Sequence, residues 1–507
     1  MSSLVKLASS FSGPDLFVAV SFVKRSSLPL PPGPPKTFYF GNAHQIPSKF
    51  KYLKFMEWSK QYGDVMHLTV FGAPVIVLNS VEAVTDLLEK KSAIYSSRPR
   101  SHMADIMGYS SSTLLAPYGE PLRRSRKLMS AALNSRVSKT YHPIQERVAQ
   151  DFAYLLLENP QQLKDNIKRA TGSAILEISY GYKLTGKDDP HLPLVEQATH
   201  NFGLAVSGGF WIDYLPFLRF VPLPLWWPST RKYIQDGRSL SVRIREELHQ
   251  YVKRQMAAGT ASASFTSMLL QAKGTVTGED DEEEMIKRTS SILYGAGSDS
   301  SCALLEAFFL AMILHPEVQK KAQAELDAVI GNERFPTMQD RSQLPYMDAI
   351  IKETIRWAAV VPLAVPHALI EEDEYRGMRI PKGSTVIGNV WSIFHNPSVY
   401  EKPFEYIPER FLAPNPPLDP FSLAFGFGRR QCPGMDVASA TAFLSMSTTL
   451  HSFDILFAKD ANGNDIKPKV EWSHGLIAHA AEHPANIVPR SAKAVELIRT
   501  THWGADE

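Results

Sequence analysis

The segment from residue 425 to residue 434 contains the residues of this chain best suited to chemistry. It reads Phe-Gly-Phe-Gly-Arg-Arg-Gln-Cys-Pro-Gly, so one cysteine, Cys432, lies between glycines and follows two arginines. A thiolate is a strong electron donor to iron, and its sulfur must be deprotonated and shielded from solvent. Glycines at positions 428 and 434 allow the backbone to wrap around such a sulfur. A lone cysteine is more often an inert buried thiol, but the flanking pattern favours a metal ligand here.

This segment matches F-x-x-G-x-R-x-C-x-G at every fixed position and resembles the haem-binding loop of the cytochrome P450 family. The resemblance implies that the cofactor is haem b, iron protoporphyrin IX, with Cys432 as its axial thiolate ligand. It also implies that Arg430 donates to a haem propionate and that Phe425 packs against the ring or the sulfur. Gly434 is expected to bring backbone N–H groups to the sulfur.

A second motif, residues 296 to 301, reads Ala-Gly-Ser-Asp-Ser-Ser and lies within a long helical pattern. Glycine in a helix costs roughly 1 kcal/mol relative to alanine, so it needs a reason. The motif resembles the oxygen-binding signature of the P450 family. This implies that Ala296 and Gly297 lie against the cofactor and that Asp299 and Ser300 are the catalytic acid-alcohol pair that relays protons. Ser300 stands where the family usually has threonine. Outside this context, small residues on a helix face are more often close-packing positions.

Three further residues stand where the family places donors to the haem carboxylates. They are Arg98, Arg126 and His367. The family commonly has a tryptophan four residues before the second of these arginines, whereas this chain has Leu122. The resemblance therefore predicts that one hydrogen-bond donor is missing and that the haem is held a little less tightly.

Four positive residues, Arg123, Arg124, Arg126 and Lys127, form a dense cluster in a predicted helix. Runs of charge are usually solvated faces. In this family the corresponding face receives an acidic flavoprotein reductase, and complementary charge raises the encounter rate. We therefore expect NADPH-cytochrome P450 reductase as a transient partner.

A charged pair on another predicted helix is expected to be structural. Glu353 and Arg356 are three residues apart, which places them on one helix face. Arg410 follows in Pro-Glu-Arg-Phe, and the family joins two such motifs in a Glu-Arg-Arg network that fixes the cysteine loop. Cys302, three residues after Asp299, is expected to be a small core residue.

These residues must be positioned by mainly helical elements. The longest helix is predicted to start at the acidic cluster 280–284 and to end at His315, before Pro316, with a length of about 50 Å. Residues 64–70 and 74–78 predict a hairpin, and further strands are expected near 377–387. The predicted class is mainly α (α+β). By resemblance, the fold is that of a cytochrome P450: a helical domain around a haem, with a long central helix and small β-sheets.

The chain is expected to contain one large domain, residues 36–507, after a short apolar segment and proline-rich hinge at residues 1–35. The apolar run 16–23 has eight residues, whereas a membrane-spanning helix needs roughly 20. The aromatic, proline-rich segment 210–227 fits either a buried connector or a loop at the membrane interface. We therefore expect peripheral or weak attachment to the cytosolic face of the endoplasmic reticulum membrane.

The composition excludes several classes of protein. A net charge of +2 gives no global attraction to nucleic acid, so no nucleic-acid partner is expected. Two cysteines in 507 residues argue against a disulfide scaffold and for a reducing compartment. With 44% hydrophobic and 21% charged residues, the chain has the composition of an ordinary folded protein.

Together these features predict a haem-thiolate monooxygenase that oxidises a lipophilic small molecule with O2 and electrons from NADPH. The pocket is expected between residues 98 and 118, near Phe210 and Tyr294, and at 362–365 and 475–477. Its largely apolar residues favour a terpenoid or polycyclic aromatic substrate of fungal secondary metabolism. The alternatives are a haem-thiolate isomerase or dehydratase that needs no reductase, and a non-catalytic haem sensor. Both are disfavoured by the Asp299-Ser300 pair.

Overall fold

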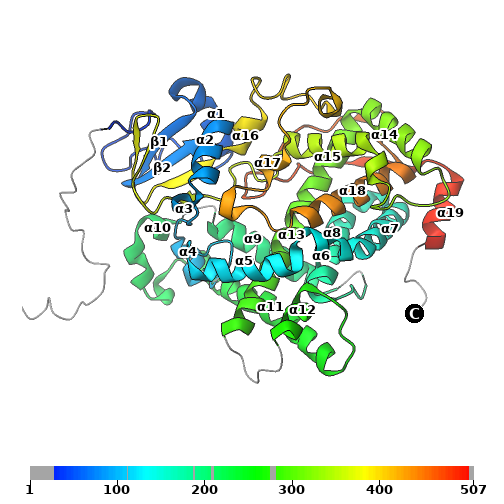
Figure 1. The fold of residues 1–507 in the computed structure, drawn as a ribbon, viewed down its shortest axis with the longest axis horizontal. Coiled ribbons are helices and arrows are strands. Elements are labelled where there is room, and N and C mark those ends of the chain that lie inside the picture. Colours follow the sequence, from blue (N-terminus) through cyan, green and yellow to red (C-terminus); the bar gives the residue numbers. More distant parts are fainter. Residues whose placement is uncertain (1–27, 111, 187–188, 207–209, 274–280, 502–507) are drawn as a thin grey trace, which may run out of the picture.

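The computed structural model describes residues 28–110, 112–186, 189–206, 210–273 and 281–501. Figure 1 shows a broad helical body with a smaller sheet-containing region beside it, built from an early and a late part of the chain. The apolar run 16–23 lies outside the described residues, so its role stays a prediction. Nothing in the structure tests the proposed division at residue 35.

Most of the described chain is helical, which confirms the expected class. The helices of the first half are α1 (Lys51–Tyr62), α2 (Val81–Val84), α3 (Ser92–Tyr95), α4 (His102–Ile106), α5 (Glu120–Leu133), α6 (Ser135–Ser138), α7 (His142–Glu158), α8 (Leu163–Tyr180), α9 (His191–Val206), α10 (Trp211–Tyr214), α11 (Pro228–Ala257) and α12 (Phe265–Lys273). Those of the second half are α13 (Asp281–Leu314), α14 (Pro316–Val329), α15 (Pro345–Ala358), α16 (Val390–Phe394), α17 (Phe421–Ala424), α18 (Met435–Ser452) and α19 (Ala492–Thr501). Shorter 3-10 turns include η4 (Pro216–Phe220), η5 (Leu223–Leu225), η7 (Pro408–Leu412) and η8 (Gly428–Arg430).

The strands form three small sheets. The largest has the order β1-β2-β6-β3, with β1 (Val65–Val70), β2 (Ala73–Leu78), β6 (Thr385–Gly388) and β3 (His367–Ala368). The hairpin β1-β2 turns at Phe71 and Gly72, which have φ of +47° and +85°, and β2 pairs with β6 in parallel. The other sheets are β4-β5 and β8-β7-β9, formed by β4 (Asp373–Tyr375), β5 (Met378–Ile380), β7 (Phe453–Lys459), β8 (Asp465–Ile466) and β9 (Ala485–Pro489).

Helix α13 is the central element of the helical body. Its first turn carries four acidic residues, which suit the positive end of the helix dipole, and it ends at Leu314, two residues before Pro316. Helices α5, α8, α9, α11, α15 and α18 pack against it. Residues 302–313 are all buried, because neighbours surround this half of the helix. In the described part of the chain it is the one helix long and apolar enough to cross a membrane, but 67% of its most apolar window is buried inside the protein.

The aromatic segment 210–227 contains only short turns, as its prolines predict, and it has two kinds of side chain. Phe210, Leu218, Leu223 and Trp226 pack against an apolar cluster that includes Met103 and Ile234. Five other large side chains of the segment are exposed: Trp211, Phe217, Phe220, Leu225 and Trp227. The buried-connector interpretation therefore describes one face of this segment, and the other face is open.

Candidate active site

The cysteine loop lies between η8 and α18 and is closed by local contacts. The Cys432 N–H donates to the carbonyl oxygen of Phe425 at 2.7 Å. Gly428 has φ of +51°, and a Cβ there would lie 2.6 Å from the carbonyl oxygen of Leu88, so the position requires glycine. Gly434 has an ordinary φ of −91°, but a Cβ there would lie 3.9 Å from the Cys432 Sγ. The turn therefore requires glycine at position 428, whereas a Cβ at position 434 would make only an ordinary van der Waals contact with the sulfur.

Cys432 and Phe425 both line a cavity of about 1770 Å³, to which the cysteine is exposed. Burial raises the pKa of the Cys432 thiol, while the Gly434 N–H and the positive Arg126 act in the opposite direction. A bound metal ion deprotonates a coordinating thiol. The loop therefore offers the cavity one sulfur donor.

Three arginines line the same cavity without an acidic partner among the described residues. Each donates to a backbone carbonyl oxygen: Arg98 to Val365 at 2.6 Å, Arg126 to Gln431 at 2.6 Å and Arg430 to Ser96 at 2.7 Å. Within the described ranges, no carboxylate bonds any of the three. Burial and repulsion from Arg430 lower the pKa of Arg98, and burial and repulsion from Arg126 lower the pKa of Arg430 to about 10. A ligand carrying carboxylates would relieve this uncompensated positive charge.

His367 lies among these cations and is only 2% exposed. Its Nδ1 is 2.8 Å from the carbonyl oxygen of Tyr95, and burial and the neighbouring Arg98 lower its pKa to about 3. With Nδ1–H donating to that carbonyl, the neutral ring has an acceptor at Nε2. His367 can therefore donate to a ligand carboxylate from Nε2 only when it is protonated, a state that the carboxylate itself would favour.

The cavity fits haem b by the chemistry of its donors. The loop thiol, a set of cations that no described carboxylate bonds and enough volume for a macrocycle are what an iron porphyrin with two propionates requires. Cys432 would hold the iron, and Arg98, Arg126, Arg430 and His367 would face the carboxylates. Leu122 also lines the cavity and is 3% exposed, and its side chain offers no hydrogen bond.

The motif on α13 lines the cavity too, and its two small residues have different surroundings. Ala296 is exposed to the cavity, and its carbonyl oxygen accepts a 2.8 Å hydrogen bond from the Ser300 Oγ. A Cβ on Gly297 would lie 3.0 Å from the Ile175 side chain of α8. Gly297 therefore allows close packing of two helices, the plainer of the two interpretations, while its backbone borders the cavity.

The Asp299 carboxylate does not contact the Ser300 hydroxyl. Within the part of the chain that the structure describes, its partner is His479, whose Nε2 is 3.3 Å from the Asp299 Oδ1. The His479 Nδ1 is 2.9 Å from the Glu306 Oε2. Our sequence analysis missed both His479 and Glu306. No spacing rule connects them, because they are 173 residues apart in the chain.

The pair on α15 forms the expected network. The side chains of Glu353 and Arg356 are fully buried and joined by two hydrogen bonds of 2.7 and 2.8 Å. The Arg410 Nε is 3.3 Å from the Glu353 Oε1. Arg356 also donates to the carbonyl oxygens of Phe394 and Pro403, so the network ties α15 to the chain that leads to the cysteine loop.

Most of the segments expected to form the pocket do line the cavity. They contribute Tyr109, Leu114, Phe210, Leu363, Val365 and Leu476. Tyr294 is an exception. It is buried against Tyr180 and donates to the carbonyl oxygen of His191 at 3.0 Å, so it belongs to the core between α8, α9 and α13.

The comparison with known families now decides the identity of this fold. The sequence pattern of the family "Cytochrome P450" matches residues 31–482, which is most of the chain. This chain belongs to the cytochrome P450 family. It is 40% identical to cytochrome P450 monooxygenase claR of Ampulloclitocybe clavipes, over 94% of this chain and 89% of that protein. It is 38% identical to cytochrome P450 monooxygenase 208 of Postia placenta, over 96% and 95%.

A solved structure agrees with the family at the level of the fold. A zebrafish cytochrome P450, solved with abiraterone, has a TM-score of 0.70 and 23% sequence identity, covering 87% of this chain and all of that one. The P450 fold and the haem-thiolate cofactor are thus confirmed, and the fungal relatives establish the monooxygenase class over the isomerase and sensor alternatives.

Proposed function

We propose that this cytochrome P450 hydroxylates a lipophilic, uncharged small molecule. The observation that carries the proposal is the composition of the cavity that holds Cys432 and Ser300, which continues into an apolar region that includes Leu114, Phe210, Leu363, Val365, Leu476 and Ile477. Apolar walls bind a substrate by burial of its surface and leave few groups to pair with a charged one. A terpenoid or polycyclic aromatic compound of fungal secondary metabolism fits these walls.

The reaction consumes one substrate molecule, O2, NADPH and H+, and yields the alcohol, water and NADP+. Bound haem supplies the activation of dioxygen. We assign Cys432 as its ligand and Arg98, Arg126, Arg430 and His367 as donors to its carboxylates, with Phe425, Gly434, Ala296 and Gly297 around it. Ser300 and Asp299 would deliver protons from the α13 side of the cavity, since both line the cavity that Cys432 also lines.

The experiment uses the purified, haem-loaded full chain. The carbon-monoxide difference spectrum of the reduced protein should show the red-shifted band of thiolate ligation. A panel of terpenoids and polycyclic aromatics should then contain a compound that shifts the spectrum of the ferric protein and is hydroxylated with 18O from 18O2. Binding confined to carboxylate- or phosphate-bearing compounds would contradict an apolar substrate.

We propose NADPH-cytochrome P450 reductase as the electron donor, docked over α5. Arg123, Arg124 and Lys127 are exposed on this helix, and the neighbouring Arg126 bonds the backbone of the cysteine loop. Arg123 is paired with Glu120, so Arg124 and Lys127 carry the less compensated charge. An acidic partner here would lie close to Cys432.

The double change Arg124→Gln and Lys127→Gln tests this docking by stopped-flow reduction. Reduction should slow severalfold at low salt, and the difference should narrow at high salt because counter-ions screen surface charge. Lys320→Gln, at an exposed position of α14, is the control and should leave the rate unchanged. A salt-independent defect would contradict electrostatic docking.

We also propose peripheral attachment to the cytosolic face of the endoplasmic reticulum membrane through an aromatic rim. This rim consists of exposed side chains on two segments: Phe38, Tyr39, Phe40, Trp211, Phe217, Phe220, Leu225 and Trp227. Phe71 joins the two, with ring centroids 5.7 Å from Phe40 and 6.0 Å from Trp211. Indole and phenyl rings favour the interface of a bilayer.

Flotation with phosphatidylcholine vesicles tests the aromatic rim. Replacement of Trp227 and Phe220 by serine should reduce the vesicle-bound fraction severalfold. Replacement of Phe404 by serine, which is also exposed but lies elsewhere in the chain, should not change it. Equal binding by both variants would contradict the rim as the attachment site.

A further inference from the structure

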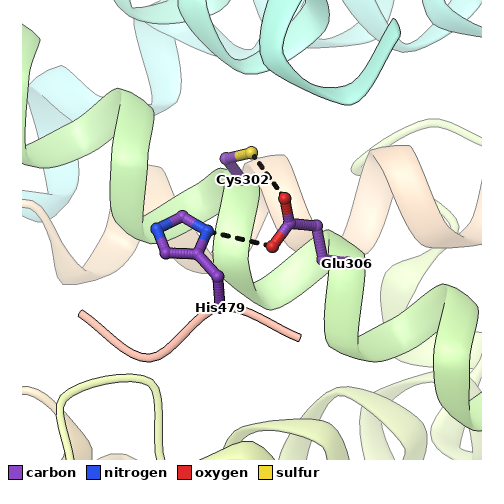
Figure 2. A group of neighbouring side chains, drawn as sticks. All are labelled: Cys302, Glu306 and His479. Atoms are coloured by element: carbon purple, nitrogen blue, oxygen red, sulfur yellow. Dashed lines mark hydrogen bonds and ion pairs between the residues drawn. The ribbon is translucent and has the colours of Figure 1, made fainter. Parts of the chain in front are cut away.

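A chain of polar side chains along α13 lines the same cavity and is not explained by haem binding. Figure 2 shows Cys302 and Glu306 on this helix, with the ring of His479 from a late segment beside them. The Cys302 Sγ is 3.6 Å from the Glu306 Oε1, and the Glu306 Oε2 is 2.9 Å from the His479 Nδ1. The other ring nitrogen reaches Asp299. The ring therefore lies between two carboxylates.

The backbone around His479 is held firmly in place. The His479 N–H donates to the Ser473 Oγ at 2.9 Å, and its carbonyl oxygen accepts from the Ser473 N–H at 2.7 Å. The preceding Ala478 N–H donates to the carbonyl oxygen of Val360 at 2.8 Å. A local turn at Ser473 and one bond to the distant Val360 thus hold the backbone of His479 in place, so the position of its ring does not depend on the side chain alone.

The charges around the ring favour its protonated form. Burial opposes protonation of His479, but hydrogen bonds with Asp299, Cys302 and Glu306 outweigh it and raise its pKa to about 12. The titratable groups facing this cluster are Asp299, Cys302 and Glu306 on α13, Glu482 and His483 on the late segment, and Lys168 on α8. At neutral pH the ring is an imidazolium between Asp299 and Glu306.

The two carboxylates differ in their access to solvent. Both residues line the cavity, but the Asp299 side chain is 33% exposed and that of Glu306 only 6%. Asp299 is therefore the more open of the two partners, so a proton on the imidazolium can leave through Asp299 while the less exposed Glu306 holds the opposite nitrogen.

We propose that His479 is a positioning residue that holds the Asp299 carboxylate and supplies it with a proton. This inference rests on the proposed role of Asp299 in proton delivery. In the step, the Nε2–H bond breaks, a proton passes to the Asp299 Oδ1, and the imidazole is neutral until a proton returns to it from solvent. No electron moves within the cluster. Replacing the imidazolium by a neutral side chain would remove both the ion pair and the stored proton.

The test compares His479→Gln with His483→Gln in the haem-loaded full chain. Glutamine keeps an amide that can bond one carboxylate but removes the charge. His483 is the matched control, because it lies on the same segment and its Nδ1 bonds the carbonyl oxygen of Ala481. Both variants should keep the thiolate-type carbon-monoxide spectrum of the wild type, which shows that the fold and the haem ligand are intact.

The first readout is the pH dependence of the melting temperature, which does not depend on activity. A pKa raised in the folded protein stabilises it fully below the unfolded value of about 6.5, and this stabilisation is lost as the pH rises toward 12. The difference in melting temperature between the wild type and His479→Gln should therefore narrow from pH 6.5 to pH 9. The difference for His483→Gln should not show this trend. A constant difference for His479→Gln would overturn the ion pair.

The second readout is NADPH oxidation driven by cytochrome P450 reductase, with its pH profile and solvent isotope effect. His479→Gln should slow it severalfold, increasingly so at higher pH, and enlarge the isotope effect, because the proton then comes directly from solvent. If the pH profile of NADPH oxidation is the same for His479→Gln and His483→Gln, the proposal is overturned, even if the melting temperatures reveal an ion pair. If the wild-type protein does not oxidise NADPH, that result contradicts the proposed function. The melting temperatures would still show whether His479 forms the ion pair.

A bound cation is the competing explanation for this cluster. The donor atoms of Cys302, Glu306 and His479 all lie within 4.8 Å of one another. Plasma mass spectrometry of the purified wild type should find no stoichiometric zinc. Finding one zinc ion per wild-type chain and none in His479→Gln would overturn the proposal, because His479 would then bind a metal ion and would not carry a proton.

Discussion

The loop around Cys432 and the segment of α13 around Asp299 line one cavity but are built differently. The cysteine is held by its own neighbours in sequence, with Phe425 accepting its N–H and Gly428 making the turn. Asp299 is held by His479, which a separate late segment brings to the helix. The cysteine half of the site is therefore a local motif, whereas the Asp299 half exists only in the folded chain.

The two cysteines give the sharpest way to break this comparison. Cys432→Ser should abolish the thiolate-type band in the reduced carbon-monoxide spectrum, because serine provides no sulfur donor. Cys302→Ser should retain the band in full, since this buried residue bonds Glu306 and lies on the α13 side. A thiolate-type band in Cys432→Ser would show that the loop does not hold the iron.

The network behind the cysteine loop should show the next largest effect. Arg356→Met leaves the fully buried Glu353 without its closest partner, and losing one member of a buried ion pair costs about 3–5 kcal/mol of unfolding free energy. Denaturant unfolding measures this loss. Lys54→Met is the control, because its pair with Glu57 is solvent-exposed and such pairs contribute about 0–1 kcal/mol. If both variants lose the same unfolding free energy, the buried network contributes no more to stability than an exposed ion pair.

On the α13 side, Ser300→Ala tests the proton relay at its hydroxyl. The variant should bind haem normally but release severalfold more peroxide per NADPH, because the hydroxyl that faces the cavity is gone. Ser300→Thr should retain coupling. Ser291→Ala removes another hydroxyl of the same helix, bonded at 3.0 Å to the Arg288 carbonyl oxygen, and should have no effect. Unchanged coupling in Ser300→Ala would remove Ser300 from the relay.

Gly297→Ala should show the smallest effect and separates helix packing from cofactor contact. The added Cβ meets Ile175 at 3.0 Å, a crowding that costs about 1–3 kcal/mol, while the gain in helix propensity offsets about 1 kcal/mol of it. Shortening the neighbour with Ile175→Val should restore the unfolding free energy if packing is the cause. A haem spectrum altered in both the single and the double variant would instead place Gly297 against the cofactor.

Much of the fold was accessible from the sequence because its signals are local. The acidic first turn and Pro316 fixed α13 to within one residue at each end, and the Phe71-Gly72 turn located the first hairpin. The spacing of Glu353 and Arg356 placed both charges on one helix face. The exposure of half of segment 210–227 was left open, because a sequence of aromatic residues and prolines does not reveal which side chains find a core.

The sequence by itself determined the chemistry of the cysteine loop, since the glycines, the arginine and the sulfur act within ten residues of backbone. The pairing of His479 with Asp299 and Glu306 became visible only in the tertiary structure. Asp299 and Glu306 could have been ordinary helix residues, and His479 an ordinary turn residue. Packing of the late segment against Val360 and α13 places the ring between them, and attraction to the two carboxylates then favours the charged ring although burial opposes it.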